Sequence, residues 1–382
     1  MYDNDGIKFA IFMGRDLEKQ LTGLIQRYDE IKLAEISKTI FHEIQKVDIQ
    51  DKNYELSLAL TNYYFERTWG VCQTDISNGK TAIGENKYKY CFDLLLNYEK
   101  SSNYKFHKGT PYFFLGYCYL VNGNLDLAFQ MIHNGHMENR IAYPKLGREY
   151  TEAPSYLFMS LNAKDDRNYL YHYVLIMKEK IDFFIDQHNK LSQKTTTYEI
   201  FDNKFLSRTN TIFDDVKFFF VYFIMNLINM NLPGGEVMTD NNFSNIRKIE
   251  LMFDLCLVID KTLHEKYKNP YIKEGVGEYL FEKHLTQEKD PKMIIPKLKL
   301  NDGTKFEING DPASVSMHLL SNNVLYRGKS IDYCFGCMLL AWNIRNFSAH
   351  NLNGIDEVLK LSYTSIIVRL FSALFFAAEA LN

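Results

Sequence analysis

The sequence predicts a mainly α-helical protein of two domains. Only 8 prolines and 20 glycines occur among its 382 residues, so few positions interrupt a helix. Apolar residues recur at spacings of three and four over long stretches, which is the period of one helix face. The chain is 46% hydrophobic and 24% charged, enough apolar material for more than one core. We therefore expect a helical-repeat-like N-terminal domain followed by a C-terminal helical bundle.

Residues 1–195 are expected to form the N-terminal domain, a series of helices separated by short polar joints. One stretch within it resembles the tetratricopeptide (TPR) helix-turn-helix pattern. The residues that carry this resemblance are Tyr112, Leu115, Gly116, Tyr119, Gly123, Ala128, Ile132 and Gly135. Gly116 and Ala128 are small enough for two antiparallel helices to approach closely. Because no convincing neighbouring copy follows, the resemblance predicts TPR-like helical pairs rather than a repeat array.

A polar stretch at 192–203, with three consecutive threonines, marks the expected domain boundary. Residues 204–382 then form the second domain. Apolar patterns predict helices at 212–231 and 245–266, with a Pro-Gly-Gly break between them.

A β-hairpin is expected at about 296–309, inserted into the second domain. Polar and apolar residues alternate on both sides of an Asn-Asp-Gly turn, which is typical of paired strands. Lys297, Lys299 and Lys305 would face outward. They could contact phosphates, and an ordinary solvated face is the simpler alternative.

The helical pattern then resumes at 312–326, 331–349 and 356–381, and the last of these is expected to be a central packing helix. The apolar segments 218–228 and 365–381 fall short of the ~20 uninterrupted apolar residues that a membrane span needs. We interpret both as buried core helices. The N-terminus has no secretory signal pattern. The sequence therefore predicts a cytoplasmic protein without a membrane contact.

The charge and the cysteine content of the chain argue against some classes of function. A net charge of −3 gives no protein-wide positive field, so any contact with nucleic acid must be local. Cys334 and Cys337 form a CxxC pair, but no second pair follows, and we interpret them as small core residues. His264, His284 and His318 are isolated in the sequence. Since motifs for zinc hydrolases and phosphate loops are absent, we expect neither a metal nor a cofactor.

The candidate site lies where an apolar helix face ends in a cation. Phe335, Met338 and Trp342 follow one helix face, and Arg345 is next on it. A buried guanidinium needs an anion, carbonyl groups or a water-filled groove, and no acidic residue lies within ten positions of it in the sequence. An Asn-Leu-Asn-Gly stretch predicts a helix end near 348–351, where His350 could turn back toward Arg345.

Arg345, Asn346 and His350 together resemble the R-x4–6-H motif of the HEPN superfamily. The resemblance implies a metal-independent endoribonuclease in which two such domains pair and bring two Arg/His sets into one cleft. His350 would act as general acid or base, Arg345 would hold the phosphate, and Asn346 would orient one of them. The RNA 2′-OH would attack the adjacent phosphate.

The chain contains a second Arg-Asn-x3-His sequence, Arg167 to His172, so the spacing alone has little value. Arg167 follows two aspartates and precedes an apolar run, which predicts a helix start with a surface ion pair. We therefore assign the site to Arg345 and His350. A chain with two sites that pairs with itself is the alternative.

These observations give one expected function and one rival. The expected function is an RNA-cleaving homodimer of a bacterial defence or toxin system, with an activating ligand, an antitoxin or a protein partner on the N-terminal domain. The rival is a non-catalytic interaction or sensor protein whose C-terminal domain dimerises. In the rival, Arg345 forms a buried ion pair with a remote carboxylate and His350 caps the last helix carbonyls.

Overall fold

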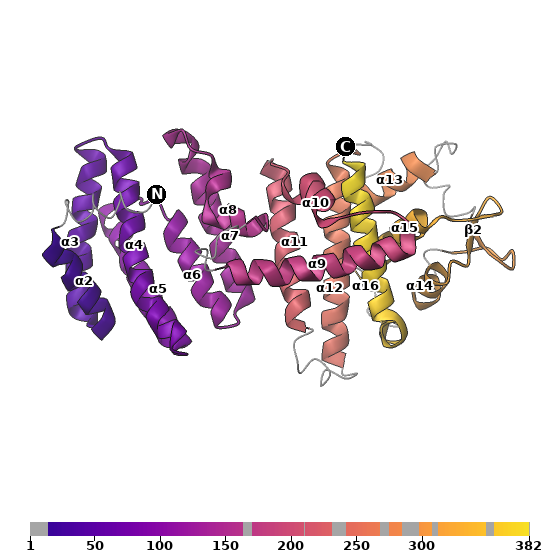
Figure 1. Cartoon of the computed structure of the whole chain (residues 1–382), viewed down its shortest axis with the longest axis horizontal. Helices are drawn as coiled ribbons and strands as arrows, with labels where there is room; N and C mark the ends of the chain where they lie inside the picture. Colours follow the sequence, from indigo (N-terminus) through magenta and orange to yellow (C-terminus); the bar gives the residue numbers. More distant parts are fainter. Residues whose placement is uncertain are drawn as a thin grey trace. The chain divides into compact units, whose positions relative to one another are not determined.

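The computed structural model describes residues 14–162, 170–209, 211–230, 242–267, 275–284, 298–307, 312–348 and 355–381. The protein is mainly α-helical, as predicted (Figure 1). The chain forms two compact units. The first comprises Met1–Phe158 with Asn162–Tyr171, and the second comprises Met159–Leu161 with His172–Asn382.

The first unit consists of consecutive helices joined by short connections. The elements are α2 (Arg15–Arg27), α3 (Glu30–Ile49), α4 (Tyr54–Ser77), α5 (Thr81–Ser102), α6 (Gly109–Val121), α7 (Leu125–Ala142), the short η1 (Pro144–Leu146) and η2 (Tyr150–Glu152), and α8 (Pro154–Met159). Asp29, Asn53 and Asn124 cap α3, α4 and α7, since each side chain accepts a hydrogen bond from a backbone amide three residues on. From α2 to α7, each helix packs against the next one, and α2, α3 and α4 also pack against the next but one.

Glycines let neighbouring helices of this unit approach closely. A Cβ atom at Gly116 of α6 would lie 2.6 Å from Cγ1 of Ile132 and 2.9 Å from the carbonyl oxygen of Ala128 on α7. Gly84 of α5 is equally crowded, since a Cβ there would lie 2.7 Å from Cγ1 of Ile76 on α4. Both helix pairs therefore depend on the absence of a side chain at one position.

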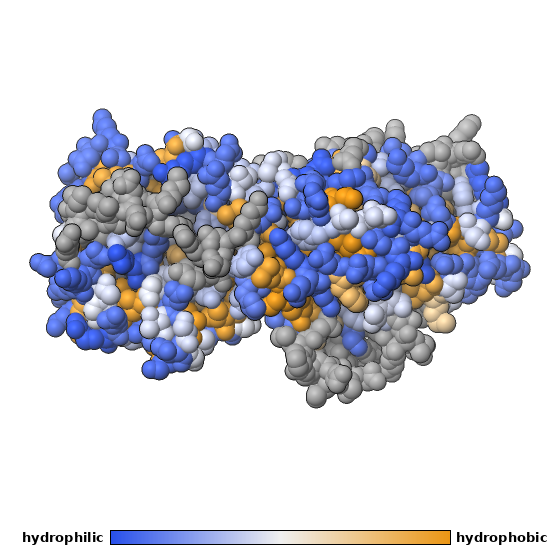
Figure 2. Space-filling view, viewed as in Figure 1, coloured by the Kyte–Doolittle hydropathy of each residue, from blue (hydrophilic) through white to orange (hydrophobic). Residues whose placement is uncertain are grey.

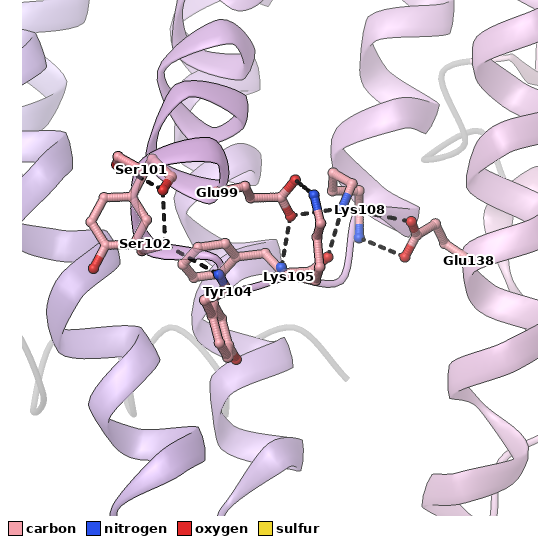
Figure 3. Close-up of polar contacts among 9 residues, drawn as sticks. Glu99, Ser101, Ser102, Tyr104, Lys105, Lys108 and Glu138 are labelled. Atoms are coloured by element: carbon pink, nitrogen blue, oxygen red, sulfur yellow. Dashed lines mark hydrogen bonds and ion pairs between the residues drawn. The ribbon is translucent and has the colours of Figure 1, made fainter.

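A buried charge cluster links α5, the α5–α6 connection and α7 (Figure 3). Nζ of Lys108 lies 2.8 Å from Oε1 of Glu99 and 3.7 Å from Oε1 of Glu138. Oε1 of Glu99 also accepts a hydrogen bond from the Phe106 amide at 2.8 Å. Because Lys108 and Glu99 are both buried, the pairing is needed to offset their lost hydration. The cluster fixes the α5–α6 connection against α5 and α7.

The second unit is a helical bundle with a small sheet. Its helices are α9 (Tyr171–Ser192), α10 (Tyr198–Phe201), η3 (Asp202–Leu206), α11 (Thr211–Met230), α12 (Asn242–His264), α13 (Gly275–His284), α14 (Pro312–Leu320), α15 (Tyr333–Ser348) and α16 (Ile355–Ala380). The yellow helix in Figure 1, α16, packs against α12, α14 and α15, so it is central as predicted.

Within the described residues, one window, Tyr363–Ala380, is long and apolar enough to cross a membrane, but 72% of it is buried inside the protein. Such burial is typical of a core helix, as predicted from the sequence for residues 365–381.

The division between the units falls before α9, whereas the sequence placed it after α9, at 192–203. The reason is the packing of α9 on α16. The ring of Phe184 stacks on that of Phe371, with 3.7 Å between centroids and an 8° interplanar angle. Lys194, in the polar stretch expected to be the domain boundary, donates a hydrogen bond from Nζ to Oε2 of Glu379 on α16 at 2.8 Å. That stretch is therefore part of the second unit.

The expected β-hairpin is described over residues 298–307. Its turn is present, because the Leu300 amide donates to the Thr304 carbonyl at 2.8 Å, and Leu298 and Phe306 are buried as the alternation predicts. Within these residues the second arm adds one bridge, between Lys299 and Lys305.

The main partner of this hairpin's first strand comes from further along the chain. The strand β1 (Leu298–Leu300) pairs antiparallel with β2 (Val324–Tyr326), and β2 pairs with β3 (Lys329–Ser330). The helix predicted at 312–326 therefore ends early, at Leu320. Asn322 adopts a left-handed backbone, φ 53°, which ends the helical course and lets the chain reverse into β2.

One buried arginine ties this sheet region to the central helix. Arg369 of α16 is only 8% exposed. Its guanidinium donates to the Leu320 carbonyl at 2.6 Å and to Oδ1 of Asn322 at 3.3 Å, and it lies 5.2 Å from the centre of the Tyr333 ring. Arg369 thus caps the C-terminal end of α14 from within the core.

Candidate functional site

Arg345 lies in the last turn of α15, at the point where burial decreases. Phe335 and Met338 are buried on the same helix face, Trp342 is partly exposed, and the Arg345 side chain is 22% exposed. The predicted path of the apolar face is therefore correct as far as Arg345. A cation in the last turn also interacts favourably with the partial negative charge of the helix end.

A carboxylate on another helix meets this guanidinium. Nη2 of Arg345 lies 3.4 Å from Oδ2 of Asp260 on α12, whose side chain is only 5% exposed. Oδ1 of Asp260 accepts a hydrogen bond from the Val276 amide in the first turn of α13, at 3.1 Å. One carboxylate thus connects α12 to both α13 and α15.

The start of α13 lies directly against α12 beside this carboxylate. A Cβ atom at Gly275 would lie 2.2 Å from the carbonyl oxygen of Asp260 and 2.6 Å from the amide nitrogen of His264. Only glycine fits there without a shift of the backbone. Gly275 therefore allows the start of α13 to reach Asp260. The negative charge of Asp260 in turn interacts favourably with the N-terminus of α13.

A buried thiol lies beside this ion pair. Cys256, one turn before Asp260 on α12, is buried, and burial raises the pKa of its thiol while the Arg345 charge opposes that shift. Removing either charge of the pair would leave the other charge largely shielded from water without its ion-pair partner, which should destabilise the protein.

The structure describes only part of the predicted site. Arg345 and Asn346 are described, and Asn346 is half-buried at the end of α15. His350 lies outside the described residues, between Ser348 and Ile355 in the sequence. The convergence of Arg345 and His350 therefore stays a prediction. Arg167, of the second Arg-Asn-x3-His sequence, also lies outside, whereas His172 is exposed near the start of α9.

Asp260 is the residue that sequence reasoning missed. The alternative interpretation of Arg345 requires a remote carboxylate, but the sequence does not identify which one. A signal was nevertheless present, because Asp260 interrupts an apolar stripe that includes Cys256 and Leu263, both buried. Charged residues are rarely fully buried unless they are paired, so such an interruption indicates a partner elsewhere.

The lysines of the expected hairpin give little indication of a phosphate surface. Lys299 and Lys305 are exposed, and Nζ of Lys305 lies 3.0 Å from Oε1 of Glu307. Lys297 lies outside the described residues. On the face shown in Figure 2, hydrophilic residues predominate and hydrophobic ones appear in small separate areas.

A second group of polar side chains lies at the other end of α13. His284, Asp332 and Cys334 each offer a ligand atom, and these atoms lie within 4.8 Å of one another. The sequence predicts that His284 is isolated and that Cys334 is a core residue. The structure instead brings them together, and Cys334 is only partly buried.

Comparison with models of protein families, with curated proteins and with solved structures finds no match to this chain. The chemistry of Arg345 and its neighbours has to carry the functional argument. A guanidinium can grip a phosphate with paired N–H groups, and a carboxylate behind it fixes its orientation. Proton transfer would require an additional group, such as the imidazole of His350.

Proposed function

We propose that this chain is a metal-independent endoribonuclease of the HEPN type. Its site comprises Arg345, Asn346 and His350 and is completed by the same residues of a second copy. The observation that carries the proposal is the position of Arg345: a partly exposed guanidinium at the end of an apolar helix, with the buried Asp260 behind it. An arginine placed in this way is suited to binding a phosphate group.

In the proposed reaction, the 2′-OH of RNA attacks the adjacent phosphorus and the 5′-oxygen of the next nucleotide leaves. His350 takes the proton from the nucleophile or supplies one to the leaving group. Arg345 binds the nonbridging oxygens and stabilises their increasing charge, and Asn346 orients the phosphate or the imidazole. The products carry a 2′,3′-cyclic phosphate and a 5′-hydroxyl, and DNA is not cleaved.

The first unit would recognise the signal or partner that controls cleavage. From α2 to α7 each helix contacts the next, and α2, α3 and α4 also contact the next but one, which is the packing expected of stacked helical pairs. The α6–α7 pair has the TPR-like residues. An activating ligand, an antitoxin or a protein partner would bind there. By family analogy, RNA cleavage would serve bacterial defence or a toxin system, with the protein in the cytoplasm.

The ion pair with Asp260 also favours a second candidate function. If this pair serves only to join α12 and α15, the chain is a non-catalytic interaction or sensor protein that dimerises through its C-terminal unit. In that case neither Arg345 nor His350 has a role in chemistry.

The two candidates differ in an RNA cleavage assay that has an internal control. The full chain is incubated with single-stranded RNA without divalent metal, and product ends are identified by mass spectrometry. We expect cyclic-phosphate ends, no cleavage of 2′-deoxy substrate, and a loss of at least about a hundredfold in His350→Ala and Arg345→Ala. The matched control carries Arg167→Ala with His172→Ala, which alters the same motif elsewhere.

Full cleavage by His350→Ala, or loss of cleavage only in the control variant, would exclude the assigned site. The binding-protein alternative predicts no cleavage by any variant, including after addition of a cell extract as a source of activating ligands. Oligomeric state is measured in parallel by light scattering, because a monomeric but active protein would contradict the composite site.

A further inference from the structure

We propose that His284, Asp332 and Cys334 bind a divalent transition metal ion of the zinc type. The three residues come from two elements: His284 ends α13, while Asp332 and Cys334 flank the first residue of α15. Their ligand atoms lie within 4.8 Å of one another. Imidazole nitrogen, carboxylate oxygen and thiolate sulfur are together the ligand set that zinc prefers.

The separations are close to those of a metal site. Zinc bonds of about 2.0–2.3 Å in tetrahedral geometry place ligand atoms roughly 3.3–3.8 Å from one another. Nδ1 of His284 lies 3.8 Å from Oδ2 of Asp332, a few tenths of an ångström more than the roughly 3.3–3.6 Å that a nitrogen–oxygen pair on zinc requires. Cys334 completes the group with a side-chain movement of about 1 Å.

Two of the three ligands, Asp332 and His284, are held by Phe335 in a way that leaves a ligand atom for the metal. Oδ1 of Asp332 caps α15 by accepting the Phe335 amide at 2.7 Å, and Oδ2 is on the side of His284. The imidazole lies flat on the Phe335 ring, with 4.6 Å between centroids and an 8° interplanar angle. The ring plane and the carboxylate are thus oriented before a metal arrives, which lowers the entropy cost of binding.

The polar atoms of this cluster are incompletely satisfied within the described residues. Nε2 of His284 is buried and has no hydrogen-bond partner among them. A metal accepts a lone pair from either ring nitrogen, and Nδ1 is the nitrogen that faces Asp332. The fourth position would be taken by water or by the Tyr279 hydroxyl, which lies 3.3 Å from Sγ of Cys334.

Cys337, the other cysteine of the CxxC pair, is not part of the cluster. It is fully buried, and its thiol lies near Tyr333 and Arg369 instead. The two cysteines therefore differ in environment, although their spacing alone would suggest a shared metal. This difference provides a control for the test.

The metal would brace α13 at its C-terminal end. The N-terminal end of the same helix donates the Val276 amide to Asp260, which contacts Arg345. The inference does not depend on ribonuclease activity, because it concerns the opposite end of α13 and has its own measurement.

The test measures binding of Zn²⁺ and Co²⁺ by the full chain. We expect one equivalent per chain, with a dissociation constant on the order of micromolar or tighter, and a sulfur-to-cobalt charge-transfer band. Cys334→Ser should abolish the band, and His284→Gln or Asp332→Asn should weaken binding at least tenfold. Asp332 is exposed, so its variant should fold normally, and circular dichroism checks the fold of each protein.

The matched controls are Cys337→Ser for the thiol and His264→Gln for the imidazole, and both should keep the metal. The proposal is overturned if the wild-type protein binds less than one equivalent, or binds it as tightly after Cys334→Ser. Loss of the metal in Cys337→Ser, with its fold intact, would also overturn the assigned ligand set.

Discussion

Arg345 of α15 and Asp260 of α12 form an ion pair across the second unit, with Nη2 and Oδ2 3.4 Å apart. The second oxygen of the carboxylate binds the start of α13. The cation at the end of the apolar helix face is therefore positioned by two other helices. Both the proposed chemistry and the stability of the unit depend on this pair.

Neutralising Asp260 should destabilise the protein and weaken the proposed activity. In Asp260→Asn, the side-chain oxygen can still accept the Val276 amide, but the partner charge of Arg345 is lost. We expect a loss of about 2 kcal/mol in unfolding free energy, less than for a fully buried pair because Arg345 is 22% exposed. RNA cleavage should fall less than in Arg345→Ala.

A double-mutant cycle separates the ion pair from other effects of these substitutions. It combines Asp260→Asn with Arg345→Met and measures urea unfolding. The double variant should be more stable than the sum of the single effects predicts. Strictly additive effects would show that the two side chains do not stabilise each other.

A side chain at Gly116 should separate α6 from α7. Gly116→Ala places a methyl group 2.6 Å from Cγ1 of Ile132, and such overpacking costs about 1–3 kcal/mol. Gly70→Ala is the control, because nothing lies within 4 Å of its added methyl on α4. It should stabilise the protein by up to about 1 kcal/mol through helix propensity. Unfolding curves that move in the same direction for both variants would contradict the close approach.

Acid should weaken both units through buried histidines. Burial lowers the pKa of His107 in the first unit and of His188 in the second to about 4, from an ordinary 6.5. Between these values the unfolded chain binds more protons, so stability is complete above pH 6.5 and falls toward pH 4. Each histidine contributes a loss of about 1.4 kcal/mol per pH unit within that window.

His188→Gln tests this acid dependence, because glutamine does not titrate. The variant should lose less stability between pH 7 and pH 5 than the wild type does, measured by urea unfolding at each pH. Equal losses in the two proteins would exclude His188 as a source of acid sensitivity.

Asp254 should show the opposite pH dependence. Burial raises its pKa to about 6, with a further rise from Glu250 on the same helix. The folded protein therefore binds more protons between pH 4 and 6, and stability from this group falls as pH rises through that window. Asp254→Asn should raise stability at pH 7.5 by about 1–2 kcal/mol, after allowance for partial exposure, and should have little effect at pH 4. Thermal unfolding at the two pH values measures the difference.

The elements predicted best from the sequence were long helices with a strong apolar period. The expected range 212–231 became Thr211–Met230, and 356–381 became Ile355–Ala380. The three-residue strand Val324–Tyr326 was missed because it is too short to show a period. The polar segment after α9 was predicted to be a domain boundary. Its contacts with α16, such as that of Lys194 with Glu379, join residues distant in sequence and leave no local pattern.

The same limit applies to the sites. The sequence could identify Arg345 as a cation that needs a partner, since an apolar helix face leads to it. It could not identify Asp260, nor place His284 beside Asp332, because both contacts depend on how separate helices pack. Local spacing can mark Asp260 as a charge on an apolar helix face, but it does not show which residue is its partner.

The contacts of Arg369 should respond to pH differently from the ion pairs of this protein. Every partner that the structure describes for it is uncharged: a main-chain carbonyl, the amide of Asn322 and the face of Tyr333. Protonating a carboxylate breaks its salt bridge, whereas the contacts of Arg369 involve no carboxylate and stay unchanged. As the medium is acidified, the end of α14 and the neighbouring strand should thus stay fastened to α16 after carboxylate-dependent links elsewhere have opened.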